Sequence, residues 1–258
     1  MSNVTAYDND RLFVHLQFAD DALHDAEQCD ALAALQQAGC PVIYRRLNSL
    51  SDLGAEFFAW EFATAVAGAA LDINPFDEPD VNSAKQRTQE LLVQAPTPPL
   101  PVSFTDDSLT AYSAAGPAPD LTHCLQQWLS QRRDGDYIAI LGYLPEACWP
   151  ELSDIRASLR QQQPAATCLA LGPRYLHSSG QLHKGGANTG LFLMITDTAA
   201  HDLAIPGQKR SFAQLISAQA LGDMNVLLDR GRRVLHIHLH ARSRGLLALQ
   251  QALDRVSS

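Results

Sequence analysis

The chain has 258 residues, of which 46% are hydrophobic and 18% charged, so it is long and apolar enough to bury a sizeable core. The formal net charge of −9 argues against nucleic-acid or anionic-membrane binding, because those functions usually need a basic surface. The five cysteines include no C-x-x-C pair and are expected to be reduced, mostly buried thiols of a cytoplasmic protein. We expect neither a signal peptide nor a membrane span, because no basic start precedes an apolar run and no stretch of about 18 residues is continuously apolar.

The first part of the chain alternates strand and helix patterns. Residues 11–18 (RLFVHLQF) and 41–47 (PVIYRRL) are predicted strands, and the segment between them is a predicted helix that ends near Gly39. Residues 51–72 form a predicted long helix that is apolar on most faces, and we expect it to be central and buried. A further helix is predicted over residues 77–94, with an acidic start that suits the positive end of the helix dipole.

The composition changes between residues 95 and 120, where six prolines rule out a regular helix. This segment is interpreted as a connector or lid-like excursion with at most one short strand, PVSFT. Beyond it, helix and strand patterns alternate to the end of the chain. Predicted strands are DYIAILGYL, ATCLALG, TGLFLMIT and RRVLHIHLH.

This alternation predicts an α/β fold of three layers, with a mostly parallel sheet between two layers of helices. The expected organisation is an N-terminal α/β portion over residues 1–95, a Pro-rich connector over residues 96–120, and a C-terminal α/β portion over residues 121–258. In such folds ligands gather at the carboxyl ends of the strands. Two loops are therefore favoured as binding sites: residues 172–190, after ATCLALG, and residues 73–81 (INPFDEPDV), after the long helix predicted over 51–72.

The loop GPRYLHSSGQLHKGGANTG contains two histidines, a lysine and several glycines. Histidine is the side chain that most readily moves a proton near neutral pH, and glycine lets the backbone approach a ligand closely. The competing interpretation is a Gly-rich connection with solvated histidines. In the segment INPFDEPDVNSAK, Lys85 can point towards a ligand at the helix start, although a Pro-shaped helix entry with a solvated lysine is the preferred interpretation of the pattern alone.

Three histidines alternate in HIHLH, so His236, His238 and His240 share one face of a strand. Three imidazoles can bind Zn²⁺, but neighbours on one face of a strand are about 7 Å apart and no carboxylate or cysteine lies nearby to complete the site. A solvated edge face is the preferred interpretation, and no metal site is predicted.

Two of these segments resemble phosphoglucose isomerases. The C-terminal signature of that family runs F-D-Q-x-G-V-E-x-x-K, and the segment FDEPDVNSAK matches it at Phe76, Asp77, Val81 and Lys85. The loop segment HSSGQLHKGG resembles the His-containing H-S-x-G-Q loop of bacterial members. Because the loop follows the Lys signature, the order is similar to the C-terminal part of bacterial transaldolase/phosphoglucose isomerase fusions.

The resemblance implies a sugar-isomerase (SIS), Rossmann-like fold and interconversion of glucose 6-phosphate and fructose 6-phosphate without metal or organic cofactor. It implies that His177 is the ring-opening acid/base, that Lys85 assists near O1 and O5, and that Glu78 and Gln181 contact the substrate. Glu78 stands where the family has Gln, and Asn82 stands where it has Glu. An ionised Glu accepts hydrogen bonds but donates none, and it carries a negative charge towards an anionic substrate.

Other parts of the family's site are not found in the sequence, namely the Glu base that moves the C2 proton, the G-G-R-[FY]-S segment and the phosphate loop. We therefore expect the isolated chain to be inactive and to be completed by an N-terminal isomerase or transaldolase portion or by a second subunit. Two other interpretations remain open: a non-catalytic sugar-phosphate-binding or regulatory module, and an assembly unit that completes the site of another chain.

Overall fold

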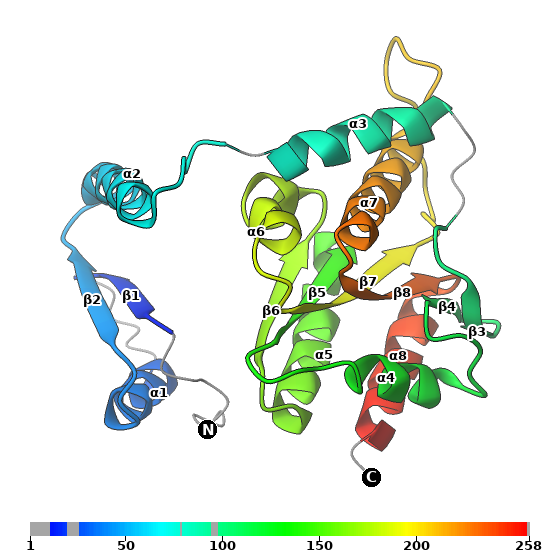
Figure 1. Ribbon diagram of the computed structural model, residues 1–258, viewed down its shortest axis with the longest axis horizontal. Helices are drawn as coiled ribbons and strands as arrows, with labels where there is room; N and C mark the ends of the chain where they lie inside the picture. Colours follow the sequence, from blue (N-terminus) through cyan, green and yellow to red (C-terminus); the bar gives the residue numbers. More distant parts are fainter. Residues whose placement is uncertain (1–10, 20–25, 78, 94–97, 257–258) are drawn as a thin grey trace. The chain divides into compact units, whose positions relative to one another are not determined.

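The computed structural model describes residues 11–19, 26–77, 79–93 and 98–256 (Figure 1). The chain forms two compact units, Met1–Asp77 and Glu78–Ser258. No helix within the described residues is long and apolar enough to cross a membrane. All five cysteines lie in described segments and are free thiols; Cys29 is exposed, Cys168 is half-buried and the others are buried.

The first unit contains one β-α-β element followed by a long helix. Strands β1 (Phe13–Phe18) and β2 (Val42–Leu47) pair in parallel, and α1 (Ala26–Gln37) connects them. Helix α2 (Asp52–Leu71) follows, and its Glu56 carboxylate accepts hydrogen bonds from the Arg45 guanidinium of β2. The predicted strands and helices of this part are confirmed.

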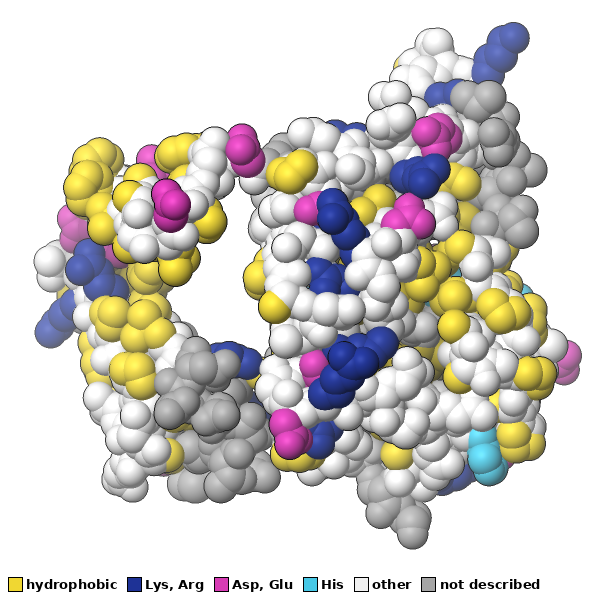
Figure 2. Space-filling model, viewed as in Figure 1, with side chains coloured by type: hydrophobic (Ala, Val, Ile, Leu, Met, Phe, Trp, Pro, Cys, Tyr) yellow, Lys and Arg dark blue, Asp and Glu magenta, His cyan; other side chains and the backbone are white. Residues whose placement is uncertain are grey.

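The prediction that α2 is buried was wrong. Among the residues of α2 only Glu56 and Gly68 are buried, and several large apolar side chains are exposed (Figure 2): Phe57, Phe58, Trp60, Phe62 and Val66. An apolar helix with no polar face gives no sign of which side is covered. Within residues 11–19 and 26–77, the structure gives α2 a two-stranded sheet and one short helix as neighbours, and these do not surround it.

The second unit is built on a six-stranded sheet in the order β3-β4-β8-β7-β5-β6. Its strands are β3 (Val102–Thr105), β4 (Leu109–Ser113), β5 (Tyr137–Tyr143), β6 (Ala166–Leu171), β7 (Gly190–Asp197) and β8 (Arg233–Leu239). Strands β8, β7, β5 and β6 run parallel, whereas β4 is antiparallel to both β3 and β8. The predicted α/β fold with a mostly parallel sheet is therefore confirmed.

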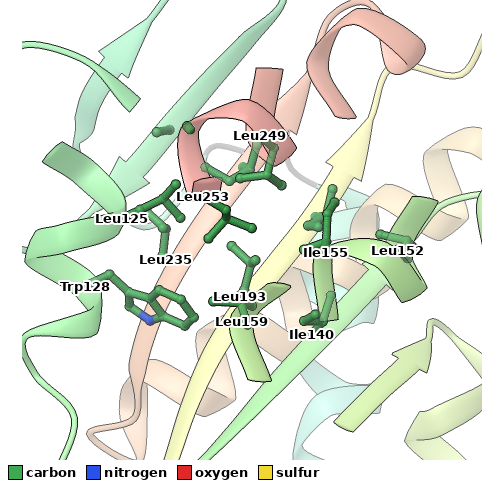
Figure 3. Close-up of a cluster of buried hydrophobic side chains, with 14 of the residues drawn as sticks. Leu125, Trp128, Ile140, Leu152, Ile155, Leu159, Leu193, Leu235, Leu249 and Leu253 are labelled. Atoms are coloured by element: carbon green, nitrogen blue, oxygen red, sulfur yellow. The ribbon is translucent and has the colours of Figure 1, made fainter. Parts of the chain in front are cut away.

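Side chains of the central strand β7 alternate between two hydrophobic cores, as expected for a strand covered on both faces. Leu191, Leu193 and Ile195 belong to one core, and Phe192 and Met194 to the other. Helices α4 (Leu121–Leu129), α5 (Trp149–Gln162) and α8 (Arg242–Val256) cover the first face, where leucines surround Trp128 (Figure 3). Helix α7 (Phe212–Asp229) covers the second face, and α3 (Pro79–Val93) packs against it (Figure 1).

The Pro-rich segment adds two strands to this sheet. The predicted strand PVSFT is present as β3, but β4 follows it in a hairpin and pairs with β8. Leu109 and Ala111 of β4 are fully buried on the first face. Strand β4 escapes a sequence pattern because its run, LTAYS, is short and mixes polar with apolar residues on both faces.

Candidate functional site

The loop between β6 and β7 begins at the carboxyl end of a parallel strand, where ligands gather in α/β folds. It contains a 3₁₀ turn (Arg174–His177) and the short helix α6 (Gly180–Gly185). Gly172 opens the loop beneath the ring of Tyr143, and a Cβ atom there would lie 2.5 Å from that ring. The close approach of the backbone to Tyr143 therefore requires glycine at this position.

Gln181 joins the His loop to the start of α3. Its side-chain oxygen accepts a hydrogen bond from the Asp80 backbone N–H at 3.1 Å, and its amide nitrogen donates to the Asp80 carboxylate at 2.8 Å. Asp80 is buried and also forms a 2.5 Å ion pair with Arg230 at the end of α7. The two segments singled out in the sequence thus meet in space, although they lie about a hundred residues apart.

The other predicted site residues have more open surroundings. His177 is exposed at the end of the 3₁₀ turn, and Lys85 is exposed on the second turn of α3, one turn beyond the exposed Asn82. Within the described segments, His177 and Lys85 form no hydrogen bond or ion pair with each other. Glu78 lies outside the described residues.

A buried polar network fixes the loop to the rest of the second unit. Asp223, in the middle of α7, accepts hydrogen bonds from the hydroxyl of Tyr175 and, at 2.6 Å, from Nζ of Lys184. The hydroxyls of Tyr143 and Tyr175 are 3.2 Å apart. Burial is the main cause that raises the pKa of both tyrosines well above the usual value, and the nearby Asp223 charge adds to it. Both hydroxyls therefore remain protonated donors.

His183 is the second histidine of the loop and is held inside it. Its Nδ1 lies 2.9 Å from the hydroxyl of Tyr137 on β5. Burial, reinforced by the Lys184 and Arg232 charges, lowers the pKa of His183 from 6.5 to about 4, so the ring is neutral near pH 7. Arg232 donates to the backbone carbonyls of Lys184 and Gly186, both at 2.6 Å, and so fixes the end of α6.

The sequence pattern could not reveal this network. Asp223 is one carboxylate in an otherwise apolar helix face, and its partner Lys184 is 39 positions away in the chain. A signal was present in retrospect, because a lone Asp on the apolar face of a helix must be paired if it is buried.

The interpretation of HIHLH as a solvated edge was wrong. Strand β8 lies between β4 and β7, and its histidines pair with threonines: His236 and His238 with Thr196, and His240 with Thr110. His236 is buried, which lowers its pKa to about 3. Among the described residues, no three His, Cys, Asp or Glu side chains are grouped so that they could hold a metal ion.

Part of this chain is similar in sequence to a known enzyme. A stretch of 64 residues, 24% of the chain, is 47% identical to a glucose-6-phosphate isomerase of Rubrobacter xylanophilus. The matched stretch spans only 15% of that enzyme's length. No protein-family model matches, and the predicted transaldolase fusion has no support in these comparisons.

A hypothetical protein of Thermus thermophilus is a structural neighbour. Its crystal structure aligns over 98% of this chain and 67% of its own length, with a TM-score of 0.48 and 14% sequence identity.

Proposed function

We propose that this chain is part of a glucose-6-phosphate isomerase, and that the His177 loop and the start of α3 bind the hexose phosphate. The observation that carries the proposal is the 64-residue stretch shared with the Rubrobacter isomerase. The hydrogen bonds between Gln181 and Asp80 support it, because they join the two segments that carry the family's residues.

The proposed chemistry is proton transfer within the substrate. In ring opening, a proton leaves the O1 hydroxyl, the C1–O5 bond breaks, and O5 receives a proton. An exposed imidazole such as that of His177 can accept and return these protons, and the Lys85 ammonium can stabilise negative charge that develops on oxygen. The carboxylate that moves the proton between C2 and C1 through an enediol is assigned here to another portion of polypeptide.

Gln181 has a double role in this proposal. Its amide uses one N–H and one lone pair on Asp80, so one N–H and one lone pair remain for a sugar hydroxyl. The side chain would thereby hold the loop against α3 and contact the substrate at the same time.

Calorimetric titration of the purified chain with fructose 6-phosphate tests the proposal. We expect binding that is weakened by Lys85→Met and by His177→Ala, because these two side chains are assigned to the oxygen atoms of the sugar ring. In a coupled isomerase assay we expect little or no turnover from the isolated chain. Absence of fructose 6-phosphate binding would refute the proposed site, and robust turnover would refute the assignment of the carboxylate base to another polypeptide.

The exposed apolar surface of α2 favours a second function, that of an assembly unit which completes the site of another chain. A parallel pair of strands is normally part of a larger sheet covered on both faces, yet β1 and β2 form a sheet of two strands. Co-purification with an isomerase fragment that carries the catalytic Glu, and activity restored on mixing, would support this function. A variant with Phe57→Glu and Phe62→Glu on α2 should lose the association.

A further inference from the structure

The second unit contains a cavity of about 1170 Å³ that the proposed isomerase chemistry does not use. Its floor is formed by the carboxyl ends of parallel strands, with Tyr143 from β5, Thr196 from β7 and His236 from β8. Its walls come from the first turns of α7 and from the segment between β7 and α7, which is the yellow-to-orange loop in Figure 1. Among the described residues, His177, Lys85 and Gln181 are not part of its lining.

The cavity lies where the direction of the fold reverses. From β5 the chain passes through α5, on the first face, to the neighbouring strand β6; from β7 it passes through α7, on the second face, to β8 on the opposite side. Strands β5 and β7 are adjacent, and their connections therefore leave in opposite directions. Open α/β sheets bind ligands in the crevice that such a reversal creates at the carboxyl ends of the strands.

Most of the cavity wall is apolar. The side chains that share this character are Leu91, Leu92, Leu203, Phe212, Ile216 and Leu221. Phe212, Ile216 and Leu203 are more than a third exposed, so a ligand in the cavity would remove apolar surface from water. A sugar, which needs hydrogen-bonding groups around its ring, suits such walls poorly, whereas an apolar body suits them well.

The charged groups at the cavity favour an anion. Arg242 is paired with Asp197 at 2.5 Å, and the Asp202 carboxylate accepts the Ala213 N–H at 3.0 Å. Lys209 and Arg210 also line the cavity, and neither forms an ion pair with any described residue. The first N–H groups of α7 are already bonded, that of Ala213 to Asp202 and that of Gln214 to Ser211, so Lys209 and Arg210 are the charges that remain for an anion.

The floor offers one buried polar atom without a partner. The His236 side chain is stacked on Tyr112 with ring centroids 5.1 Å apart, and its Nε2 lies 2.8 Å from the Thr196 hydroxyl. Its Nδ1 is buried and has no hydrogen-bond partner among the described residues. Buried polar groups normally have partners, so an unpaired atom on a residue that lines a cavity is a reason to look for a ligand.

We propose that this cavity binds a small organic anion whose apolar body lies against α7 and whose charged group faces Lys209 and Arg210. Gly172, the first residue of the His177 loop, lines the cavity, but His177, Lys85 and Gln181 do not, and the proposed ligand goes beyond the proposed isomerase function. Apolar walls supply most of the binding energy in this arrangement, and the two cations select for negative charge.

Calorimetric titration with 2-naphthoate, 2-naphthol and inorganic phosphate tests the proposal on the full chain. We expect 2-naphthoate to bind more tightly than the neutral 2-naphthol, and phosphate alone not to bind. The double variant Lys209→Gln, Arg210→Gln should weaken 2-naphthoate roughly threefold to tenfold, because exposed charges contribute little each, and should leave 2-naphthol unchanged. A higher salt concentration should also weaken the binding of 2-naphthoate, because it screens the two cations.

Two tryptophan variants locate the site. Ser217→Trp places a large ring in the cavity from an exposed position of α7 and should abolish 2-naphthoate binding, whereas Ala157→Trp, on the exposed surface of α5, should not.

No binding of 2-naphthoate at millimolar concentration, equal binding of 2-naphthol and 2-naphthoate, or full binding by Ser217→Trp would overturn the proposal. Competition by fructose 6-phosphate would also overturn it, because the cavity would then be the sugar-phosphate site. Failure of fructose 6-phosphate to bind at all would count against the isomerase proposal and leave this one standing.

Discussion

Lys184 donates a hydrogen bond from Nζ to Oδ1 of Asp223 over 2.6 Å, and the exposed fractions of the two side chains are 0% and 1%. The hydroxyl of Tyr175 donates to the second carboxylate oxygen, so Asp223 is satisfied by two residues of the same loop. The position of the loop that carries His177 is therefore set by a charge in the middle of α7. This pair is the only described ion pair in which both side chains are less than 2% exposed.

Replacement of Asp223 by Leu should strongly destabilise the second unit. The change leaves the Lys184 ammonium buried without a counter-charge, and breaking a buried pair in this way costs about 3–5 kcal/mol. Urea unfolding at neutral pH measures the loss. The double variant Lys184→Met, Asp223→Leu should recover most of it, because no charge then remains buried.

An exposed ion pair between α3 and the last residue of α7 provides the control. Arg87 and Asp229 are 3.2 Å apart, and about half of each side chain is exposed. Asp229→Ala should therefore cost less than about 1 kcal/mol. If Asp223→Leu cost no more than Asp229→Ala, the Lys184–Asp223 pair would not hold the loop.

His183 should make the second unit sensitive to acid. Its folded pKa of about 4 lies below its ordinary value of 6.5, so the unfolded chain binds the proton first as the pH falls. No stability is lost above pH 6.5, and the loss grows between pH 6.5 and 4, reaching about 2 kcal/mol at pH 5. His236 acts with the same sign, because burial lowers its pKa to about 3.

The variant His183→Gln isolates this contribution. Its amide can still hydrogen-bond the Tyr137 hydroxyl but does not titrate. The free energy of unfolding, measured by urea at pH 7.5 and at pH 5, should fall less between the two pH values in the variant than in the parent chain. An unchanged difference would show that His183 is not the group responsible.

Sequence patterns predicted most of the second unit because its strands and helices have clear signatures in the order of apolar and polar residues. Strand β7 is a continuous apolar run. Helix α7 follows a polar segment and begins with a capping box formed by Ser211 and Gln214. The same patterns failed where a feature depends on distant partners. The burial of His236 depends on β4, whose mixed composition hides it, and the exposure of α2 depends on what surrounds that helix rather than on its own residues.

The sequence placed the loop after a strand, but it did not reveal the side chains that hold the loop in position. Loop position after a strand pointed to residues 172–190, and the structure joins them to α3 through Gln181, which was singled out from the sequence only by resemblance. The roles of Lys184 and Tyr175 required knowledge of α7, because a buried charge is recognised by its partner in space.

Removal of the Gln181 side chain should loosen the start of α3. Gln181→Ala deletes two hydrogen bonds to Asp80, each with a net value of about 1 kcal/mol. The sum of about 2 kcal/mol predicts that hydrogen exchange of the α3 amides near Asp80 becomes roughly thirtyfold faster, while the ion pair between Asp80 and Arg230 remains. The control is Gln86→Ala, on an exposed position of the same helix. If Gln181→Ala and Gln86→Ala accelerated hydrogen exchange equally, the Gln181 hydrogen bonds would not be what stabilises the start of α3.

The last prediction concerns the contact between Gly172 and Tyr143. A Cβ atom at Gly172 would lie 2.5 Å from two ring atoms of Tyr143, which is buried and hydrogen-bonded to Tyr175, so the ring cannot move aside without breaking the network. Gly172→Ala should cost about 1–3 kcal/mol by overpacking. In the Gly172→Ala background, Tyr143→Leu should cost less than it does in the parent chain, because the shorter side chain relieves the clash. Urea unfolding of the parent chain, the two single variants and the double variant gives this coupling directly, and additive effects would contradict a direct contact between the two positions.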